Sequence, residues 1–570
     1  MVSPPPAGWL RAALRPSSPQ GPAPLGLLGL LWLLALALAL IGLNNLPLRD
    51  WDEGIVARVA LETSLAPWHQ KWLPTYWGVP YLNKPPGLHL LIAACLGLWR
   101  WGTGASAASL PPELVLRLVP AFLSTLVVPL VGLIQWRLRP GDRLSTLASA
   151  AIALTLLPLA RHGRLVMLDG AQLSAMALLW WGLLQLPSAG ERGAVRWGAV
   201  VGLAGSALLL LKAPLALPLL AGSLLIRWFD RDLSPRRGLV VLVAIAVGLL
   251  PGLVWHGAHL LARGDAAWQM WTSQGFRRVV QGIEGHGGSP LEPVLEILEG
   301  GWPWLPLWPL GLAMAWRQRG QRWARWCLGL TLLTAALVLP LRTQLPWYSL
   351  LLWPPFALLC GPALAWLVRR PAGSIPPAGW WLRRLPWFWL ALGAVLLLAS
   401  AGLLLHPALR GLAPCALLLG TGLAAGGRLL VHPDRRLRLG GLIVQIGGLW
   451  LALAWLMAGP WWLWELNESW ATPGLGALVQ GHAIEGPVYI LQEAERPSLS
   501  WYAGLPVRSL ESADQAPVEG GGSWLLLSRQ QAPGQADHCR PLERSAEWNL
   551  YRCGEESLSR RFSSPPAVPG

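Results

Sequence analysis

The run Leu25-Gly-Leu-Leu-Gly-Leu-Leu-Trp-Leu-Leu-Ala-Leu-Ala-Leu-Ala-Leu-Ile-Gly-Leu43 sets the fold class, because nineteen apolar or small residues in succession suffice for a helix to cross a bilayer. No small-residue cleavage site follows it, so we interpret the run as a membrane anchor rather than a signal peptide. Similar runs recur along most of the chain. We therefore predict thirteen spans, near residues 25–43, 114–136, 144–160, 171–187, 198–211, 213–229, 239–262, 303–316, 326–341, 347–368, 385–405, 411–430 and 440–463.

The composition supports a membrane protein. Of the 570 residues, 54% are hydrophobic and 13% are charged, whereas a soluble domain is about a quarter charged. These proportions exclude a water-soluble enzyme. The net charge of +16 comes mostly from arginines grouped between apolar runs, a pattern typical of loops beside membrane helices and not of a nucleic-acid-binding patch. The sequence therefore predicts an all-α polytopic membrane protein with no nucleic-acid partner.

The arginine groups also predict the orientation. The apolar stretch 87–99 is short for a span and is typical of an interfacial or re-entrant helix. If it does not cross, the later arginine groups all fall on the same side as Arg11 and Arg15, as the positive-inside rule requires. We therefore expect a cytoplasmic segment 1–24, a transmembrane domain 25–463 with a long outer loop 44–113, and an outer-face region 464–570.

The composition changes after residue 463. The stretches 486–491 and 523–528 are typical of short buried strands among Gly/Pro turns, so we predict a small α/β domain on the outer face. Cys539 and Cys553 lie in this tail and could form a disulfide if it faces an oxidising compartment. The other four cysteines lie in apolar segments and are interpreted as small core residues.

The first outer loop gathers charged residues at a membrane boundary. Arg49-Asp-Trp-Asp-Glu-Gly54 precedes a helical pattern, and carboxylates at such a boundary are costly and often functional. Alternatively, Asp50 or Asp52 caps the helix, and both interpretations can hold together. Later in the loop Lys84 precedes two prolines, which keep its backbone extended. It is either an ordinary turn lysine or a preorganised cation.

Weaker signals lie on the same predicted face. Asp169 ends the stretch Arg161-His-Gly-Arg-Leu-Val-Met-Leu-Asp169 and either caps the next span or serves a site. Lys212 lies between two predicted spans in Leu210-Leu-Lys-Ala-Pro214. Arg342 and Tyr348 lie where a later span begins. Each signal is weak alone, but all share one face and one order.

These segments form an ordered set: an Asp-Glu pair after the first span, Lys-Pro-Pro in the same loop, Arg…Met-x-Asp in the next outer loop, and then Leu-Lys-x-Pro. The set resembles the GT-C membrane glycosyltransferases, in the family 39-like branch of protein O-mannosyltransferases and lipid A aminoarabinose transferases. The resemblance covers roughly residues 25–360. It implies transfer of a sugar from a polyprenyl-phosphate carrier such as undecaprenyl phosphate to a lipid or protein acceptor, with inversion, at the outer face of the plasma (inner) membrane.

The resemblance also implies roles for individual residues. Asp52 would be the catalytic carboxylate, supported by Glu53, and Lys84 would neutralise the phosphate of the leaving lipid. The further substrate-binding candidates are Asp169, Lys212, Arg342, Tyr348 and Arg58. The helix at 87–99 would lie among the membrane lipids near the entrance for the carrier.

The sequence departs from the family pattern at two places. Relatives often carry an Arg-Tyr-Ala-like segment directly after the Asp-Glu pair, whereas here Arg58 comes slightly later. Many carry Glu before the Lys-Pro, where this chain has Asn83. Because that Glu neighbours a metal in some relatives, the use of a divalent metal is left open and no ligand is assigned.

Two other functional classes remain as alternatives. A transporter or flippase of the same polyprenyl-linked sugar would place ionisable groups near the bilayer midplane and show an internal repeat, whereas here the charges gather at one face and no repeat is evident. A non-catalytic assembly subunit would follow if the departures had removed activity. The sequence favours the transferase and does not choose the sugar or the acceptor.

Overall fold

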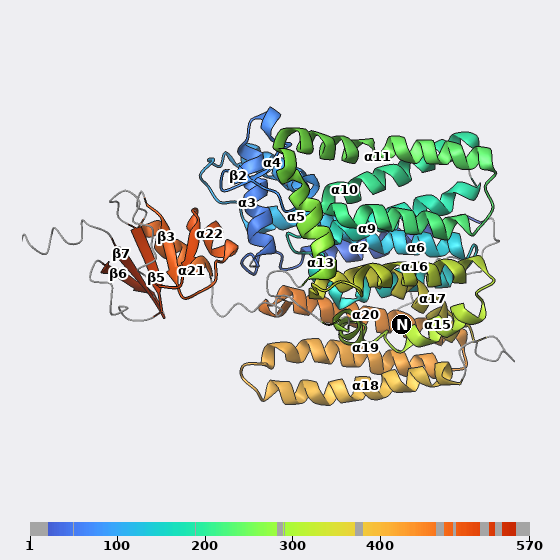
Figure 1. Cartoon of the computed structure of the whole chain (residues 1–570). Coiled ribbons are helices and arrows are strands. Elements are labelled where there is room, and N and C mark those ends of the chain that lie inside the picture. Colours follow the sequence, from blue (N-terminus) through green and yellow to red (C-terminus); the bar gives the residue numbers. More distant parts are fainter. Residues whose placement is uncertain are drawn as a thin grey trace, which may run out of the picture. The chain divides into compact units, whose positions relative to one another are not determined.

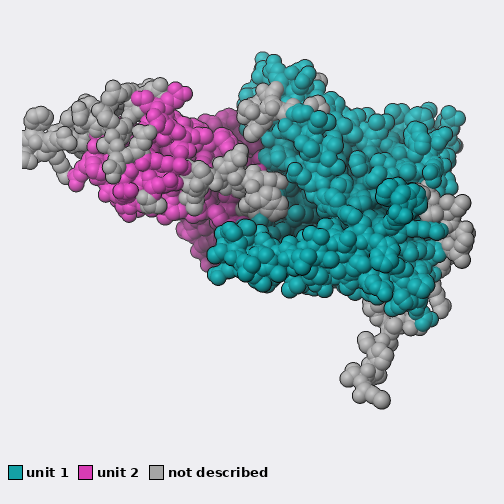
Figure 2. Space-filling view, turned by 90° about the horizontal axis from the view of Figure 1, so that it is seen from below, with its two compact units in different colours: residues 1–45, 82–88, 117–462 teal, residues 46–81, 89–116, 463–570 magenta. Residues whose placement is uncertain are grey.

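The chain divides into two compact units, which are described separately. The computed structural model describes residues 21–49, 51–188, 190–281, 289, 291–370, 380–462, 472–482, 486–512, 524–529, 539–545 and 547–553. Unit 1 comprises 1–45, 82–88 and 117–462, and unit 2 comprises 46–81, 89–116 and 463–570. Figure 2 colours unit 1 teal and unit 2 magenta.

Unit 1 is a bundle of apolar helices (Figure 1). Large apolar side chains lie on its exterior, as on α18, where Leu398 is 76% exposed, and such a surface suits contact with lipid rather than water. The main helices are α2 (Leu25–Leu40), α5 (Glu113–Thr125), α6 (Val127–Leu138), α7 (Arg143–Thr155), α8 (Leu157–His162), α9 (Leu168–Gln185), α10 (Glu191–Trp228), α11 (Pro235–Arg263), α14 (Glu292–Gly300), α15 (Leu307–Arg317), α16 (Arg322–Val338), α17 (Trp353–Arg369), α18 (Trp381–Leu404), α19 (Ala413–Val431) and α20 (Arg435–Ala458).

The helices follow the predicted apolar runs. Each of the thirteen predicted segments is mostly helical in the described part of the chain. Seven helices there are long and apolar enough to cross a membrane by length and composition, which supports a multi-pass membrane protein, while the total of thirteen spans stays a prediction. The seven are Glu113–Leu138, Glu191–Trp228, Pro235–Trp271, Pro346–Arg369, Trp381–Leu404, Arg410–Val431 and Arg435–Ala458.

Helix α10 reverses direction at its middle. Lys212 has φ −149° and ψ 81°, which is not helical. A Cβ atom placed on Gly205 would lie 3.8 Å from Leu220 Cδ2, although residues this far apart in a straight helix would be separated by about 22 Å. The two halves therefore pack as a helical hairpin with Lys212 at its tip. This agrees with the two separate runs, 198–211 and 213–229, expected from the sequence.

A proline explains why the chain turns there. Pro214 has no N–H to donate to the carbonyl of Leu210, and its ring would collide with that carbonyl in a continued helix. The neighbouring carbonyl of Leu209 has another partner, because it lies 3.2 Å from His256 Nε2 in a hydrogen bond. The break thus presents the carbonyl of Leu210 and the side chain of Lys212 at the tip.

Unit 2 contains most of the segment 44–113 that the sequence predicts to be the first outer loop, while residues 82–88 belong to unit 1. Helix α3 (Asp52–Leu65) is followed by a short hairpin of β1 (Thr75–Tyr76) and β2 (Val79–Pro80), and α4 (Gly87–Thr103) occupies the stretch expected to be an interfacial helix. The Glu62 carboxylate holds the hairpin against α3. It accepts hydrogen bonds from Thr75 Oγ1 at 2.6 Å and from the Trp77 N–H at 2.8 Å.

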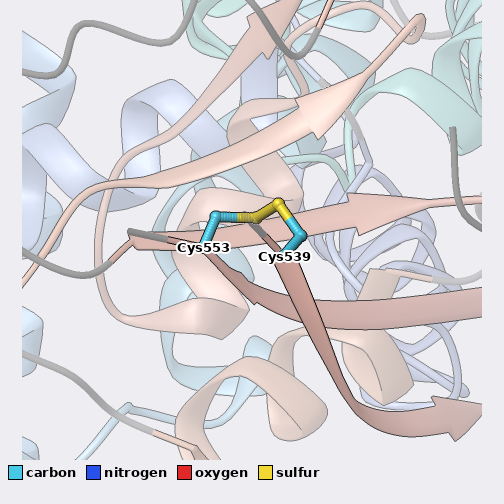
Figure 3. Close-up of a disulfide and its surroundings, with 2 residues drawn as sticks. All are labelled: Cys539 and Cys553. Carbon is cyan, nitrogen blue, oxygen red and sulfur yellow. A yellow bond between two sulfur atoms is a disulfide. The ribbon is translucent and has the colours of Figure 1, made fainter. Parts of the chain in front are cut away.

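The end of the chain forms the predicted small α/β domain, also within unit 2. Its sheet has the order β4-β3-β5-β7-β6, with β3 parallel to β4 and β5, and β7 antiparallel to β5 and β6. A disulfide joins Cys539 and Cys553 across β6 and β7 (Figure 3). The elements are α21 (Thr472–Gly481), β3 (Val488–Leu491), α22 (Pro497–Ala503), β4 (Val507–Leu510), β5 (Trp524–Ser528), β6 (Cys539–Ser545) and β7 (Trp548–Cys553).

Candidate functional site

An ion pair marks the tip of the α10 hairpin. Lys212 Nζ lies 3.3 Å from Asp169 Oδ1, and the Asp169 side chain is only 6% exposed. Asp169 stands in the first turn of α9, where the unpaired backbone N–H groups favour a negative charge. The helix terminus and the lysine therefore both hold this carboxylate. The N-cap of α9 is Met167 and no side chain makes a capping bond, so the expected capping role of Asp169 is wrong, while a role in a site is compatible with its position.

Tyr348 contacts both Lys212 and a second cation, Arg278. Lys212 Nζ lies 4.6 Å from the centroid of the Tyr348 ring, which is the geometry of a cation–π contact. The phenol oxygen of Tyr348 accepts a hydrogen bond of 2.9 Å from Arg278, and both residues are buried. We name Asp169, Lys212, Arg278 and Tyr348 the tip cluster.

Lys84 belongs to a loop that contacts this hairpin tip. Gly87, three residues later, approaches the backbone of α10 so closely that a Cβ atom on it would lie 2.7 Å from the carbonyl oxygen of Leu210. Only glycine fits there without displacing the backbone. Lys84 is half-buried and Pro85 and Pro86 are buried, so the loop is packed directly after the lysine. Unit 1 thus joins the Lys84 loop to the tip cluster.

The predicted catalytic carboxylates stand at the start of α3 in unit 2. Asp52 is the first residue of the helix and is half-buried, and Glu53 is fully buried. Glu53 Oε2 accepts a hydrogen bond of 2.6 Å from the Arg49 N–H. The N-cap position belongs to Trp51, whose side chain makes no capping bond, so Asp52 is not the N-cap. Asp50 lies outside the described residues.

Trp51 carries backbone strain beside these carboxylates. Its φ is 55° and its ψ is −85°, a combination with positive φ that bulky residues rarely adopt. Strain of this kind costs about 1–3 kcal/mol and persists only where surrounding contacts enforce it, commonly at functional sites. The strained backbone at Trp51 sets the direction in which α3 begins.

The two remaining predicted residues are Arg58 and Arg342. Arg58 pairs with Glu62 at 2.7 Å and stacks over the Trp77 ring at 3.6 Å from its centroid, so its guanidinium fastens α3 to the hairpin. Arg342 is exposed, and its backbone N–H donates to the carbonyl of Arg278. Arg342 therefore adjoins the tip cluster through its main chain.

Arg278 was not predicted. In a chain whose positive charge is mostly arginine, the pair Arg277-Arg278 resembles every other arginine group. Its distinguishing signal is position, because it lies in the predicted outer loop 263–302, where the positive-inside rule expects few arginines. An arginine on the predicted outer face is the feature that could have identified it.

Metal ligands were left open by the sequence. Among the described residues, no group of three or more His, Cys, Asp or Glu side chains has an arrangement that could hold a metal ion.

One protein-family model matches part of the sequence, and solved structures match the fold. Residues 83–252, which include Lys84, Asp169 and Lys212, match the family model of dolichyl-phosphate-mannose-protein mannosyltransferase. No curated protein matches the sequence. The crystal structure of ArnT from Cupriavidus metallidurans in the apo state aligns with a TM-score of 0.69 at 17% identity, covering 93% of this chain and 98% of that one.

The same relative bound to undecaprenyl phosphate aligns with a TM-score of 0.66 at 17% identity, over 96% of this chain and 98% of that one. The alignments run through both units, including the carboxyl-terminal region that the sequence resemblance had left out. Together with the family match, they confirm the expected resemblance to the mannosyltransferases and to ArnT, and they show that the fold is shared.

Proposed function

We propose that this chain, a multi-pass membrane protein with the fold of ArnT, is a glycosyltransferase that takes its sugar from a polyprenyl phosphate carrier. The donor would be an undecaprenyl-phosphate-linked hexose or pentose, and the acceptor a lipid or protein nucleophile at the outer face of the plasma (inner) membrane. The family match over residues 83–252 and the shared fold support the enzyme class. The identity of the donor rests on the tip cluster.

One observation carries the proposal: two cations, Lys212 and Arg278, converge on Tyr348 at the end of an apolar hairpin, next to the Lys84 loop. A phosphate on a lipid carrier has its anionic group at the membrane boundary and its chain in the hydrocarbon. Cations at the ends of apolar helices match this distribution. Preorganised positive charge also stabilises the negative charge that builds on a leaving phosphate.

The reaction that fits these residues is a single displacement. The acceptor oxygen attacks the anomeric carbon while the bond from that carbon to the phosphate oxygen breaks. The polyprenyl phosphate leaves with the bonding electrons, and Asp52 takes the proton of the acceptor as general base. Glu53 would hold the segment before Asp52 in place, through the Arg49 N–H. Attack opposite the leaving group inverts the anomeric centre.

The experiment follows release of undecaprenyl phosphate from a panel of undecaprenyl-phosphate sugars, using the full chain in lipid nanodiscs with crude lipid and protein acceptors. We expect release by the wild type and a fall of about 100-fold in kcat/KM for Lys84→Ala or Arg278→Ala. The matched controls are Lys71→Ala, whose lysine donates to the Ser64 carbonyl, and Arg277→Ala, whose side chain is exposed. Equal losses in variants and controls, or no release from any donor, would contradict the proposal.

A further inference from the structure

A tyrosine of the carboxyl-terminal domain reaches the first outer loop. Tyr502 lies in α22, and its hydroxyl makes two hydrogen bonds within unit 2. The hydroxyl oxygen accepts a hydrogen bond from the Leu48 N–H at 2.7 Å, and the hydroxyl donates a hydrogen bond to Glu113 Oε1 at 2.7 Å. One side chain thus joins the segment before α3 to the first residue of α5.

The next residues connect this contact to the proposed catalytic group. Leu48 is buried, and the N–H of the following residue, Arg49, donates to Glu53. Hydrogen bonds therefore fix both Leu48 and Glu53. Trp51, with its positive φ, lies between these two residues in the sequence. A strained conformation of this kind needs external contacts to persist. Tyr502 supplies one of these contacts from a distant part of the chain.

The packing of α22 on α3 supports the same relationship. A Cβ atom on Gly54 would lie 2.7 Å from the backbone of Pro497 and of Ser498. The first turn of α3 therefore touches the first turn of α22 backbone to backbone. Helix α22 limits where the start of α3 can lie, while the Tyr502 hydroxyl fixes the segment that leads into it.

We propose that Tyr502 is a positioning residue for Asp52. It fixes Leu48 in the segment that precedes α3 and so aims the first residue of that helix, and it does so from the carboxyl-terminal domain. This inference rests on the proposed function only in naming Asp52 as the group to be aimed. It gives the carboxyl-terminal domain a part in the transfer reaction, since α22 completes the support of the catalytic helix.

The test compares Tyr502→Phe with Tyr489→Phe. The first variant keeps the ring and removes the hydroxyl of the half-buried Tyr502, and the second removes the hydroxyl of Tyr489, a buried tyrosine of the same domain that packs on Trp524. Glu113→Gln is a third variant, which keeps an oxygen that can accept from Tyr502. The measurements are kcat, the KM for the undecaprenyl-phosphate sugar, thermal unfolding, and hydrogen exchange of the peptide 46–55.

For Tyr502→Phe we expect kcat to fall about tenfold, because small misplacements of a catalytic group are costly, while KM and the unfolding midpoint match those of Tyr489→Phe. Exchange of the peptide 46–55 should rise in Tyr502→Phe alone, and Glu113→Gln should keep at least a third of the wild-type kcat. Unchanged kcat and exchange in Tyr502→Phe would overturn the inference, as would an equal loss of kcat in Tyr489→Phe.

Different results would contradict the proposed function and the positioning role of Tyr502. If no donor supports transfer by the wild type, the proposed function fails, and hydrogen exchange alone decides the structural part. Faster hydrogen exchange of the peptide 46–55 in Tyr502→Phe then supports the stabilisation of this segment by the Tyr502 hydroxyl, and unchanged exchange overturns it. If the wild type transfers sugar and Tyr502→Phe behaves as the wild type, only the positioning inference fails.

Discussion

The ammonium of Lys212 lies 3.3 Å from the carboxylate of Asp169, and the two residues come from different helices. Asp169 lies in the first turn of α9 and Lys212 lies at the break in α10, so the pair ties the two helices together. A carboxylate this deeply buried needs a partner, because an unpaired buried charge is strongly destabilising. The pair therefore serves stability and also fixes the ammonium that we assign to the carrier phosphate.

This pairing makes the effects of mutation non-additive. Lys212→Met should lower the free energy of unfolding by about 2 kcal/mol, because it leaves Asp169 buried and unpaired. Adding Asp169→Asn to Lys212→Met should restore part of that loss, since the double variant no longer buries an unpaired carboxylate at position 169. Thermal unfolding of both single variants and the double variant in detergent gives the coupling energy. Strictly additive losses would show that the two side chains do not interact.

The hydroxyl of Tyr348 should matter for donor binding. Tyr348→Phe keeps the ring under Lys212 but removes the hydrogen-bond acceptor of Arg278, which is buried. We expect the KM for the donor to rise about tenfold, in line with one lost hydrogen bond to a charged group. Steady-state kinetics with the best donor measures this change. An unaltered KM would remove Tyr348 from the phosphate site.

Substitution of Gly87 tests the contact between the Lys84 loop and the hairpin tip. In Gly87→Ala the new methyl group meets the carbonyl of Leu210, so the loop must shift and Lys84 with it. We expect kcat/KM to fall about tenfold. Gly97→Ala is the matched control, because it lies in the same helix with open space around it, and alanine there should stabilise the helix by about 0.5–1 kcal/mol. Comparable activity of the two variants would contradict the contact.

The carboxyl group of Asp142 should make the free energy of unfolding depend on pH. Burial alone would raise the pKa of this carboxyl, but hydrogen bonding and the charge of Arg369, with two hydrogen bonds from Ser145, outweigh burial and hold the pKa at about 2. Because the folded pKa lies below the unfolded one, ionised Asp142 contributes about 2 kcal/mol above pH 4 and loses this contribution as the pH falls toward 2.

Asp142→Asn should therefore be less stable than the wild type at pH 7 and equal to it near pH 2. Unfolding midpoints measured across this range in detergent give the difference between the two proteins. The same difference at every pH would show that the charge of Asp142 is not the source of the stabilisation. Asn can still accept from the Ser145 N–H, so the comparison isolates the ionised group.

Local sequence was enough to predict some of the site. Apolar runs located the helices, and the interruption between the runs 198–211 and 213–229 placed Lys212 between two helices. Arg278 was missed because its neighbours along the chain do not set it apart. Tyr502 was missed because its contact with Leu48 joins residues 454 positions apart, and no local pattern predicts such a pairing. The strain at Trp51 depends on the same distant contacts and has no local signal of its own.

The role of Asp52 is decided by single-turnover formation of undecaprenyl phosphate from the sugar donor, with the wild type or Asp52→Asn in excess of the donor. Binding of undecaprenyl phosphate to both proteins serves as the control for an intact phosphate site. We expect Asp52→Asn to bind undecaprenyl phosphate as the wild type does but to form it from the sugar donor about 1,000-fold more slowly, as loss of a general base requires. Formation at the wild-type rate by Asp52→Asn would contradict this role.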